Sequence, residues 1–431
     1  MRFIRKGIFL SLFLFLFFTT VASSWAKSVD HSPHKNSEHV ILIDWDGFDP
    51  EFLKRANTPN IDFLVKHGVL TTAQSTYKSI SNSARASLVT GAYPEVHGNT
   101  STYYDIEKNQ AMGQSRYLAA ETIAESMASE GKTVASVQWY MLHNYGTSYG
   151  DPEHLYVQPG GSFDKRVDAT IDILNQRPVN SGGQMVTVPK IPDFLAIYGS
   201  ELDSLAHEEG PDSPNIGPLM AELDRQVGRI IQATKDVGIY NKTTFILTGD
   251  HGLTTWNPSL AQFLLNELTE AGFTPEIVPA GRTAAAETDV IIVQGVRIAD
   301  ITLRGNAATS EGYQRVRQAL ERVPHVARIL DNEDLKALHT SEKVGDFVLE
   351  AEAPWSFSLL NDGKDRGSHG SLDEMDVPLV LSGYKIRYGV LPSDPKLIDI
   401  APTISKLLGT RPPKDAQGRV LSESLTIPDS K

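Results

Sequence analysis

Apolar runs alternate with amphipathic segments along most of the chain. Several short runs are typical of buried strands, namely residues 40–43, 133–137, 194–198, 245–247 and 379–381. Between two of these runs, Leu219, Leu223, Val227 and Ile230 recur at helical spacing. Strands that alternate with helices predict an α/β fold, a three-layer sandwich around a mainly parallel sheet.

Two prolines at predicted helix starts, and one interruption of the strand–helix alternation, refine this prediction. Asp49-Pro50 and Thr58-Pro59 each place a capping residue before a proline, which is typical of a first helical turn. The stretch from about residue 256 to 357 interrupts the alternation with a strand and a helix of its own. We therefore expect an inserted α+β cap there.

The start of the chain has the pattern of a secretory signal peptide. A basic beginning is followed by an apolar run at residues 8–22, and then by small residues where a signal peptidase cleaves. The run is short for a membrane span. We expect a signal peptide at 1–26, a flexible lead-in at 27–39 and the folded part at 40–431, in a secreted or periplasmic protein with no stable membrane span after cleavage. A retained N-terminal anchor is the alternative.

Composition limits the possible partners. The 431 residues include no cysteine, which excludes disulfides and zinc–thiolate sites. The net charge of −13 argues against nucleic-acid or anionic-membrane binding through a basic surface. A phosphorylated substrate must therefore find positive charge locally, and bound metal ions would supply it.

The most informative motif is the pair Asp250-His251, which follows an apolar strand without a spacer. Neighbouring side chains on a regular strand point to opposite faces, so both reach one ion only where the strand breaks, and Gly249 and Gly252 permit that break. Asp46 likewise ends the first strand. Open α/β sheets bind ligands at the carboxyl ends of their strands, so these residues predict a metal site.

Two further groups extend this pattern. Asp203 and His207 are four residues apart, and a helix would place both on one face within reach of one ion. His369 lies among small residues that would let a loop approach a metal closely. Taken singly, each residue is more often a cap or an exposed side chain; their combination favours a metal site.

A candidate nucleophile precedes a helix predicted at residues 82–90. Ser81 would lie at the helix N-terminus, where free N–H groups favour anions. Arg85 is one turn further on the same side and is placed to grip phosphate oxygens. Ser81 acting only as a helix cap is the alternative.

Together these stretches resemble the alkaline phosphatase superfamily, and within it the type I phosphodiesterase/nucleotide pyrophosphatase branch. The matching stretches, in the family's order, are Asp46-Gly47-Phe48, Thr58-Pro59-Asn60-Ile61, residues 81–91, residues 93–98, residues 203–207, Asp250-His251-Gly252 and Ser368-His369-Gly370. They span nearly the whole chain after the predicted signal peptide.

The resemblance implies a two-metal site and a covalent mechanism. The implied ligands are Asp203, His207 and His369 for one ion, and Asp46, Asp250 and His251, with Ser81, for the other. Nitrogen and oxygen donors suit zinc, with manganese as the alternative. The resemblance further implies that Ser81 attacks phosphorus and that water hydrolyses the resulting phosphoseryl intermediate.

The chain departs from this branch beside the nucleophile. Members of the branch usually have threonine there and asparagine three residues later, whereas this chain has Ser81 and Ala84. Arg85 or Asn82 is expected to replace the missing amide as a phosphate contact. Ser81 followed by Arg85 also resembles the sulfatase signature, although Ser83 stands where that signature has proline or alanine.

The expected activity is hydrolysis of phosphodiester or pyrophosphate bonds in a small phosphorylated substrate. A diester needs a surface for its second substituent, and Tyr104 and Trp139 are expected to form part of it, with core packing as the alternative. A phosphomonoesterase in which Arg85 reads the dianion is the main alternative function. A sulfatase and a non-catalytic protein that binds a phosphorylated glycan or lipid are the others. The sequence predicts no oligomeric state.

Overall fold

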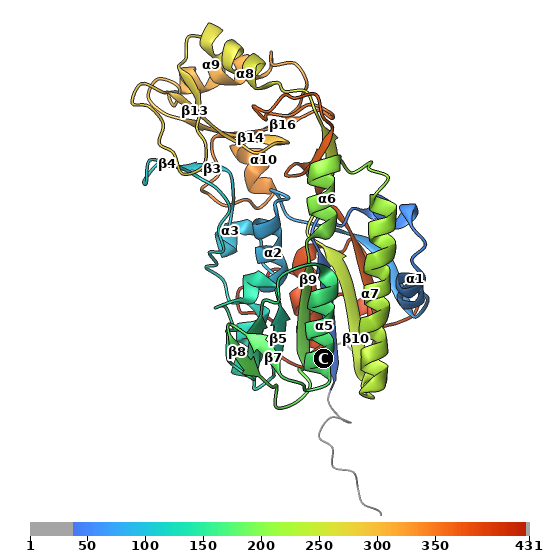
Figure 1. The fold of residues 1–431 in the computed structure, drawn as a ribbon. Helices are drawn as coiled ribbons and strands as arrows, with labels where there is room; N and C mark the ends of the chain where they lie inside the picture. Colours follow the sequence, from blue (N-terminus) through green and yellow to red (C-terminus); the bar gives the residue numbers. More distant parts are fainter. Residues whose placement is uncertain (1–37, 428–431) are drawn as a thin grey trace, which may run out of the picture. The chain divides into compact units, whose positions relative to one another are not determined.

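The computed structural model describes residues 38–427, and a seven-stranded sheet forms its centre (Figure 1). The strands are β1 (His39–Trp45), β2 (Gly68–Gln74), β5 (Val134–Val137), β6 (His154–Val157), β9 (Phe194–Gly199), β10 (Thr243–Gly249) and β18 (Asp376–Gly383). Their order is β2-β18-β10-β1-β9-β5-β6. Neighbours from β10 to β6 are parallel, and β18 is antiparallel to both of its neighbours. The predicted α/β fold with a mainly parallel sheet is confirmed.

Helices cover both faces of this sheet. One layer contains α1 (Pro59–Lys66), α5 (Phe163–Leu174) and α7 (Ile216–Asp236), and the other contains α2 (Ser81–Thr90), α4 (Ile123–Ser129) and α11 (Ile400–Leu408). Successive residues of a strand point to opposite faces. Accordingly, Ile41 and Ile43 of β1 pack in the α5–α7 layer, and Val40 and Leu42 pack in the α2 layer.

Along the chain, the segment between β11 (Thr254–Trp256) and β17 (Arg366–Ser368) forms a second sheet with its own core. Its strands are β12 (Pro275–Ile277), β13 (Val290–Gln294), β14 (Ile298–Leu303), β16 (Phe347–Ala351) and β15 (Val326–Asp331), in that order across the sheet. Its helices are α8 (Ala261–Glu270), α9 (Ser310–Leu320) and α10 (Asn332–Ala337). Figure 1 shows β13, β14 and β16 of this sheet with α8, α9 and α10. We call this stretch the inserted unit; its helices and strands, from Ala261 to Ala351, fall within the part of the sequence expected to form a cap, about residues 256–357.

Smaller elements complete the described chain. These are α3 (Pro94–His97), the hairpin β3 (Tyr103–Asp105) and β4 (Gln110–Met112), the hairpin β7 (Val179–Ser181) and β8 (Gln184–Val186), and α6 (Glu201–Glu209). The helix predicted after Asp49 is a short 3-10 segment, Pro50–Arg55. The predicted signal peptide and nearly all of the predicted lead-in lie outside the described residues. Between residues 38 and 427, no helix combines the length and apolarity that crossing a membrane requires.

The register of the central strands brings distant residues to one edge of the sheet. Trp45 of β1 pairs with Gly249 of β10 and with Gly199 of β9, so the three strands end level. Asp46 and Asp250 follow these ends directly, and α6 begins two residues after β9. At the base of the inserted unit, β11 and β17 pair in antiparallel fashion. This pairing returns the chain to the same edge immediately before His369.

Candidate active site

Six of the predicted metal ligands meet at this edge of the sheet. Their ligand atoms form two groups, each within 4.8 Å of one another: Asp203, His207 and His369 in the first, and Asp46, Asp250 and His251 in the second. The rings of His251 and His369 stack with their centroids 3.5 Å apart, so the two groups are adjacent. The cluster therefore offers two neighbouring three-ligand sets.

Each imidazole of the cluster is oriented by a backbone carbonyl. The Nδ1 atoms of His207, His369 and His251 lie 2.8, 2.8 and 3.0 Å from the carbonyl oxygens of Gly367, Ser79 and Gly252. An N–H donated from Nδ1 leaves the lone pair of Nε2 free, which is the usual arrangement of a metal-binding histidine. For His207, this Nε2 lies 3.1 Å from Oδ1 of Asp203.

Carboxylate oxygens in both sets lack the hydrogen bonds that burial normally requires. Among the described residues, Oδ1 of Asp203 and Oδ2 of Asp250 are buried and accept no hydrogen bond of good geometry. Their near neighbours are cationic or imidazole nitrogens, His207 Nε2 at 3.1 Å from the first and Arg85 Nη1 at 3.0 Å from the second. An unsatisfied buried acceptor is costly, and a bound cation would compensate each one. The donors are imidazole nitrogens and carboxylate oxygens, which suit zinc and also accommodate manganese. The residues therefore fit two divalent ions.

Burial and neighbouring charges shift the pKa values within the cluster in opposite directions. Burial alone would raise the pKa of Asp46, but Arg85 and His251 hold it well below its usual value. Burial raises the pKa of Asp250 well above its usual range. Burial alone would lower the pKa of His251, yet Asp250 and Asp46 raise it to about 9. Burial lowers the pKa of His369 well below its usual value, and the charge on His251 adds to this effect. Metal binding to such a cluster releases protons.

Ser81 begins α2 and faces the second ligand set. Its Oγ donates to Oδ1 of Asp46 at 3.3 Å and lies 3.1 Å from Nε2 of His251. The residue before it, Ile80, has an extended backbone and ends the preceding loop. The first N–H groups of a helix have no intrahelical acceptor, so this end of α2 presents donors beside the Ser81 hydroxyl.

Arg85 is paired with buried carboxylates, and its predicted phosphate contact stays a prediction. Its side chain is fully buried on the inner face of α2. Nε lies 2.6 Å from Oδ2 of Asp44, and Nη1 lies 3.0 Å from Oδ2 of Asp46 and 3.0 Å from Oδ2 of Asp250. The guanidinium of Arg85 therefore binds two carboxylates of the second ligand set, Asp46 and Asp250, together with Asp44.

The side chains of Trp139 and Tyr104, the two predicted aromatic contacts, both pack in the interior, as the alternative reading expects. Trp139 is 0% exposed, and its indole N–H donates to Oδ2 of Asp44. Tyr104 is 3% exposed, and its hydroxyl donates to Asn109 and accepts from the backbone N–H of Ala284. Their contact with substrate stays a prediction.

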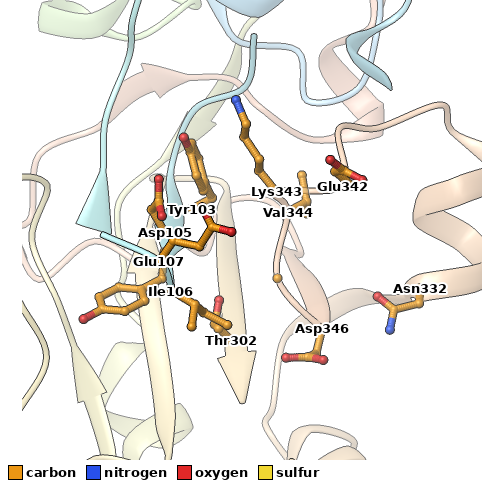
Figure 2. A pocket seen from close by; sticks show the side chains of 12 residues that line it. Tyr103, Asp105, Ile106, Glu107, Thr302, Asn332, Glu342, Lys343, Val344 and Asp346 are labelled. Atoms are coloured by element: carbon orange, nitrogen blue, oxygen red, sulfur yellow. The ribbon is translucent and has the colours of Figure 1, made fainter. Parts of the chain in front are cut away.

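The cavity beside Tyr104 is separate from the metal-ligand cluster. It has a volume of about 500 Å³, and none of the six candidate ligands lines it. Figure 2 shows Asp105 and Glu107 of the β3–β4 hairpin on one side, and Glu342 and Asp346 of the inserted unit on the other. Tyr104 therefore belongs to the contact between this hairpin and the inserted sheet.

The side chain of Asn82 uses only part of its hydrogen-bonding capacity. Its Nδ2 donates to the carbonyl oxygen of Ser115 at 2.8 Å. An amide nitrogen carries two N–H groups and the amide oxygen adds an acceptor, so capacity remains on this side chain. The contact with phosphate that the sequence suggests for Asn82 stays a prediction.

Two residues that orient the ligands were missed by the sequence analysis. The Tyr198 hydroxyl at the end of β9 donates to Oδ2 of Asp46 at 2.6 Å. Asp44 accepts from both Arg85 and Trp139. A signal for Asp44 was present, because the two-residue period of β1 puts it on the same face as Leu42, toward α2. No comparable signal distinguishes Tyr198 from other aromatic residues at strand ends.

The chain matches the type I phosphodiesterase / nucleotide pyrophosphatase family over residues 40–372. The chain belongs to this family, which is part of the alkaline phosphatase superfamily, and is accordingly a phosphodiesterase/nucleotide pyrophosphatase family hydrolase. The match runs from the start of β1 through the inserted unit to the loop after His369, and therefore includes both ligand sets.

Relatives and solved structures agree with this assignment. Bis(5'-adenosyl)-triphosphatase enpp4 of Mus musculus is 24% identical over 401 residues, which cover 89% of this chain and 80% of that protein. The structure of human ectonucleotide pyrophosphatase/phosphodiesterase 5 has a TM-score of 0.66 at 19% identity, covering 87% of this chain and 96% of that one. A murine counterpart, described as an inactive threonine-to-alanine variant in complex with AMP, has a TM-score of 0.67 at 18% identity, with the same coverage. At these identities the structures show a shared fold.

Proposed function

We propose that the protein hydrolyses phosphodiester or pyrophosphate bonds in a small phosphorylated substrate, with Ser81 as the nucleophile. The observation that carries this proposal is the position of Oγ. It lies within 3.3 Å of ligand atoms of both Asp46 and His251, at the N-terminus of a ten-residue helix. A cation held by the neighbouring ligands would stabilise the deprotonated form of this hydroxyl. The free N–H groups at the start of the helix would hold the substrate phosphate beside it.

The reaction has two steps at Ser81. In the first, Oγ forms a bond to phosphorus while the bond from phosphorus to the leaving oxygen breaks. The leaving oxygen takes the electron pair of that bond, and the hydroxyl proton passes to solvent. In the second, water attacks the phosphoseryl group and frees Oγ. Two divalent ions, one held by Asp203, His207 and His369 and one by Asp46, Asp250 and His251, would lower the pKa of the Ser81 hydroxyl and stabilise the leaving oxygen. Zinc is the proposed metal, with manganese as the alternative.

Two observations favour a diester over a monoester. A monoesterase requires an extra cation to read the dianion, and Arg85, the candidate for that role, is fully buried and paired with three carboxylates. The printed names of the relatives point the same way, since one is a bis(5'-adenosyl)-triphosphatase and one solved structure contains AMP. We therefore include nucleotide-containing phosphoanhydrides among the substrates to be tested.

The inactive threonine-to-alanine variant of the murine structure supports a hydroxyl nucleophile in this family. In this chain Ser81 would take that part with a hydroxyl that lacks a methyl group. The signal-peptide pattern of residues 1–26 further supports a proposal that the protein is exported to a periplasm or secreted.

The test compares kcat/KM for bis-p-nitrophenyl phosphate and for p-nitrophenyl phosphate with zinc-loaded protein. Preference for the diester supports the proposal, and preference for the monoester overturns it in favour of a phosphatase. Ser81→Ala should abolish turnover and leave the zinc content unchanged. Ser83→Ala is the matched control, since its hydroxyl donates to the Asn99 carbonyl within the core and should leave turnover intact.

A further inference from the structure

Lys78 is a buried cation close to the nucleophile that the proposed reaction does not use. Its side chain is 0% exposed, and it lies three residues before Ser81. Nζ donates to the carbonyl oxygens of Ser101 at 3.1 Å and Thr102 at 3.0 Å, and to Oδ2 of Asp300 at 2.8 Å. An ammonium group has three N–H donors, so these three acceptors satisfy it completely. Lys78 therefore has no free donor for substrate.

Asp300, the anionic partner of Lys78, belongs to the inserted unit. It lies in the middle of β14 with a fully buried side chain. Both of its carboxylate oxygens lie 3.2 Å from the backbone N–H of Gly345, on the loop before β16. The pair thus fastens the segment before α2 to the inserted sheet and to the turn at residues 101–102.

The next residue along the chain, Ser79, connects this anchor to the first ligand set. Its carbonyl oxygen lies 2.8 Å from Nδ1 of His369. Its Oγ donates to the carbonyl oxygen of Ser371 at 2.7 Å and accepts from the N–H of Gly370. Ser81 follows two residues later. A displacement at Lys78 would therefore reach both the orientation of the His369 ring and the position of the Ser81 hydroxyl.

We infer that Lys78 and Asp300 are positioning residues, which fix residues 79–81 so that Ser81 and His369 face the same substrate phosphorus. This inference rests on the proposed function. A buried ion pair adds little net stability compared with apolar residues of the same size, so stability alone accounts poorly for this pair. The inserted sheet is, on this view, a structural part of the active site that holds the nucleophile in place.

The test uses Lys78→Met and the charge-balanced double variant Lys78→Met/Asp300→Leu. A misplacement of about 1 Å at a reacting group can reduce turnover about 100-fold. We expect kcat for the diester to fall by about this factor in both variants, with KM nearly unchanged, because neither residue contacts substrate. Zinc titration of the metal-free proteins supplies a second readout. One of the two ions, that of the His369 set, should bind about 10-fold to 100-fold more weakly.

The matched control is Arg328→Met. Arg328 pairs with the buried Glu350 in the same inserted sheet, 2.6 Å away, and with Asp373, 2.9 Å away. Neither of these ion pairs involves residues 78–81. This variant should lose stability and keep its kcat and both zinc affinities. Wild-type kcat and zinc affinity in folded Lys78→Met would overturn the inference, and so would their recovery in the double variant, because the pair would then only balance charge. A wild-type protein without diesterase activity would contradict the proposed function, and the zinc titration would still decide the positioning role.

Discussion

Replacing Arg85 with methionine is the most informative perturbation of the metal-ligand cluster. Its guanidinium is fully buried and contacts the carboxylates of Asp44, Asp46 and Asp250 at 2.6 to 3.0 Å. The change leaves these carboxylates without their common cation while preserving most of the side-chain volume. Breaking a buried ion pair by removing one partner costs about 3–5 kcal/mol. Because one guanidinium serves three carboxylates, we expect a loss near the upper end of that range.

The loss of unfolding free energy caused by Arg85→Met should be larger in metal-free protein than in zinc-loaded protein. In metal-free protein the full penalty applies, and it is a large part of the roughly 5–15 kcal/mol by which a typical protein is stable. A divalent ion bound by Asp46 and Asp250 would neutralise two of the three carboxylates, so zinc should narrow the difference between variant and wild type. Urea unfolding with chelator and with excess zinc measures both differences.

Activity separates this role from direct contact with substrate. If Arg85 holds ligands, Arg85→Met should lower kcat and leave KM almost unchanged. Arg229→Met is the control, since it removes a half-buried pair with Asp168 between α7 and α5 and should keep kcat. A variant with wild-type unfolding free energy and a raised KM would refute the reasoning and restore Arg85 as a phosphate contact.

Further predictions concern pH, metal content and one buried hydrogen bond. Burial lowers the pKa of His97 to about 3, so the folded protein keeps this imidazole neutral while the unfolded chain is protonated below about pH 6.5. The contribution of neutral His97 to the unfolding free energy is therefore fully present above pH 6.5 and decreases as pH falls toward 3. At pH 5 the unfolding free energy should be about 2 kcal/mol lower than above pH 6.5 for this reason. Urea unfolding of wild type and His97→Gln at pH 7 and pH 5 checks this, and equal pH dependence in both would count against it. His369→Ala should bind one zinc ion fewer than wild type by metal analysis; unchanged stoichiometry would remove His369 from the ligand set. Trp139→Phe deletes the indole N–H that binds Asp44 and should cost about 1.5–3 kcal/mol of stability without raising KM, whereas a raised KM would reinstate Trp139 as a substrate contact.

The sequence predicted the sheet and the convergence at its edge for a physical reason. Parallel strands end at the same edge, so Asp46 and Asp250, which directly follow apolar runs, had to be neighbours once both runs were strands. His369 is different, because local pattern says nothing of its position. It reaches the cluster through the β11–β17 pairing, which joins segments on either side of the inserted unit. The small residues around His369 indicated only that its loop could approach a metal, and the family resemblance assigned it to the first ligand set.

The predicted substrate contacts share one feature that the sequence did not show, which is a buried polar partner for each side chain. Helical spacing correctly put Arg85 on the face of α2 that points to the site, but Asp44 lies on the same side and binds it. Trp139 follows a strand end as expected, yet its N–H satisfies that same carboxylate. The Tyr104 hydroxyl accepts a hydrogen bond from the backbone N–H of Ala284 in the inserted unit, a long-range contact that no local pattern encodes. Spacing predicts direction, whereas the partner that a side chain finally binds depends on tertiary packing.

The most direct test of the central claim is to trap the covalent intermediate. Zinc-loaded protein is mixed with excess bis-p-nitrophenyl phosphate, quenched in acid within the first turnovers, digested and analysed by mass spectrometry. If Ser81 is the nucleophile, the peptide that contains it should carry a p-nitrophenyl phosphoryl group, because one of the two p-nitrophenyl groups leaves and the other stays on phosphorus. Ser81→Ala protein that still binds zinc should carry no adduct. An adduct on another residue, or wild-type turnover by Ser81→Ala, would contradict this role of Ser81.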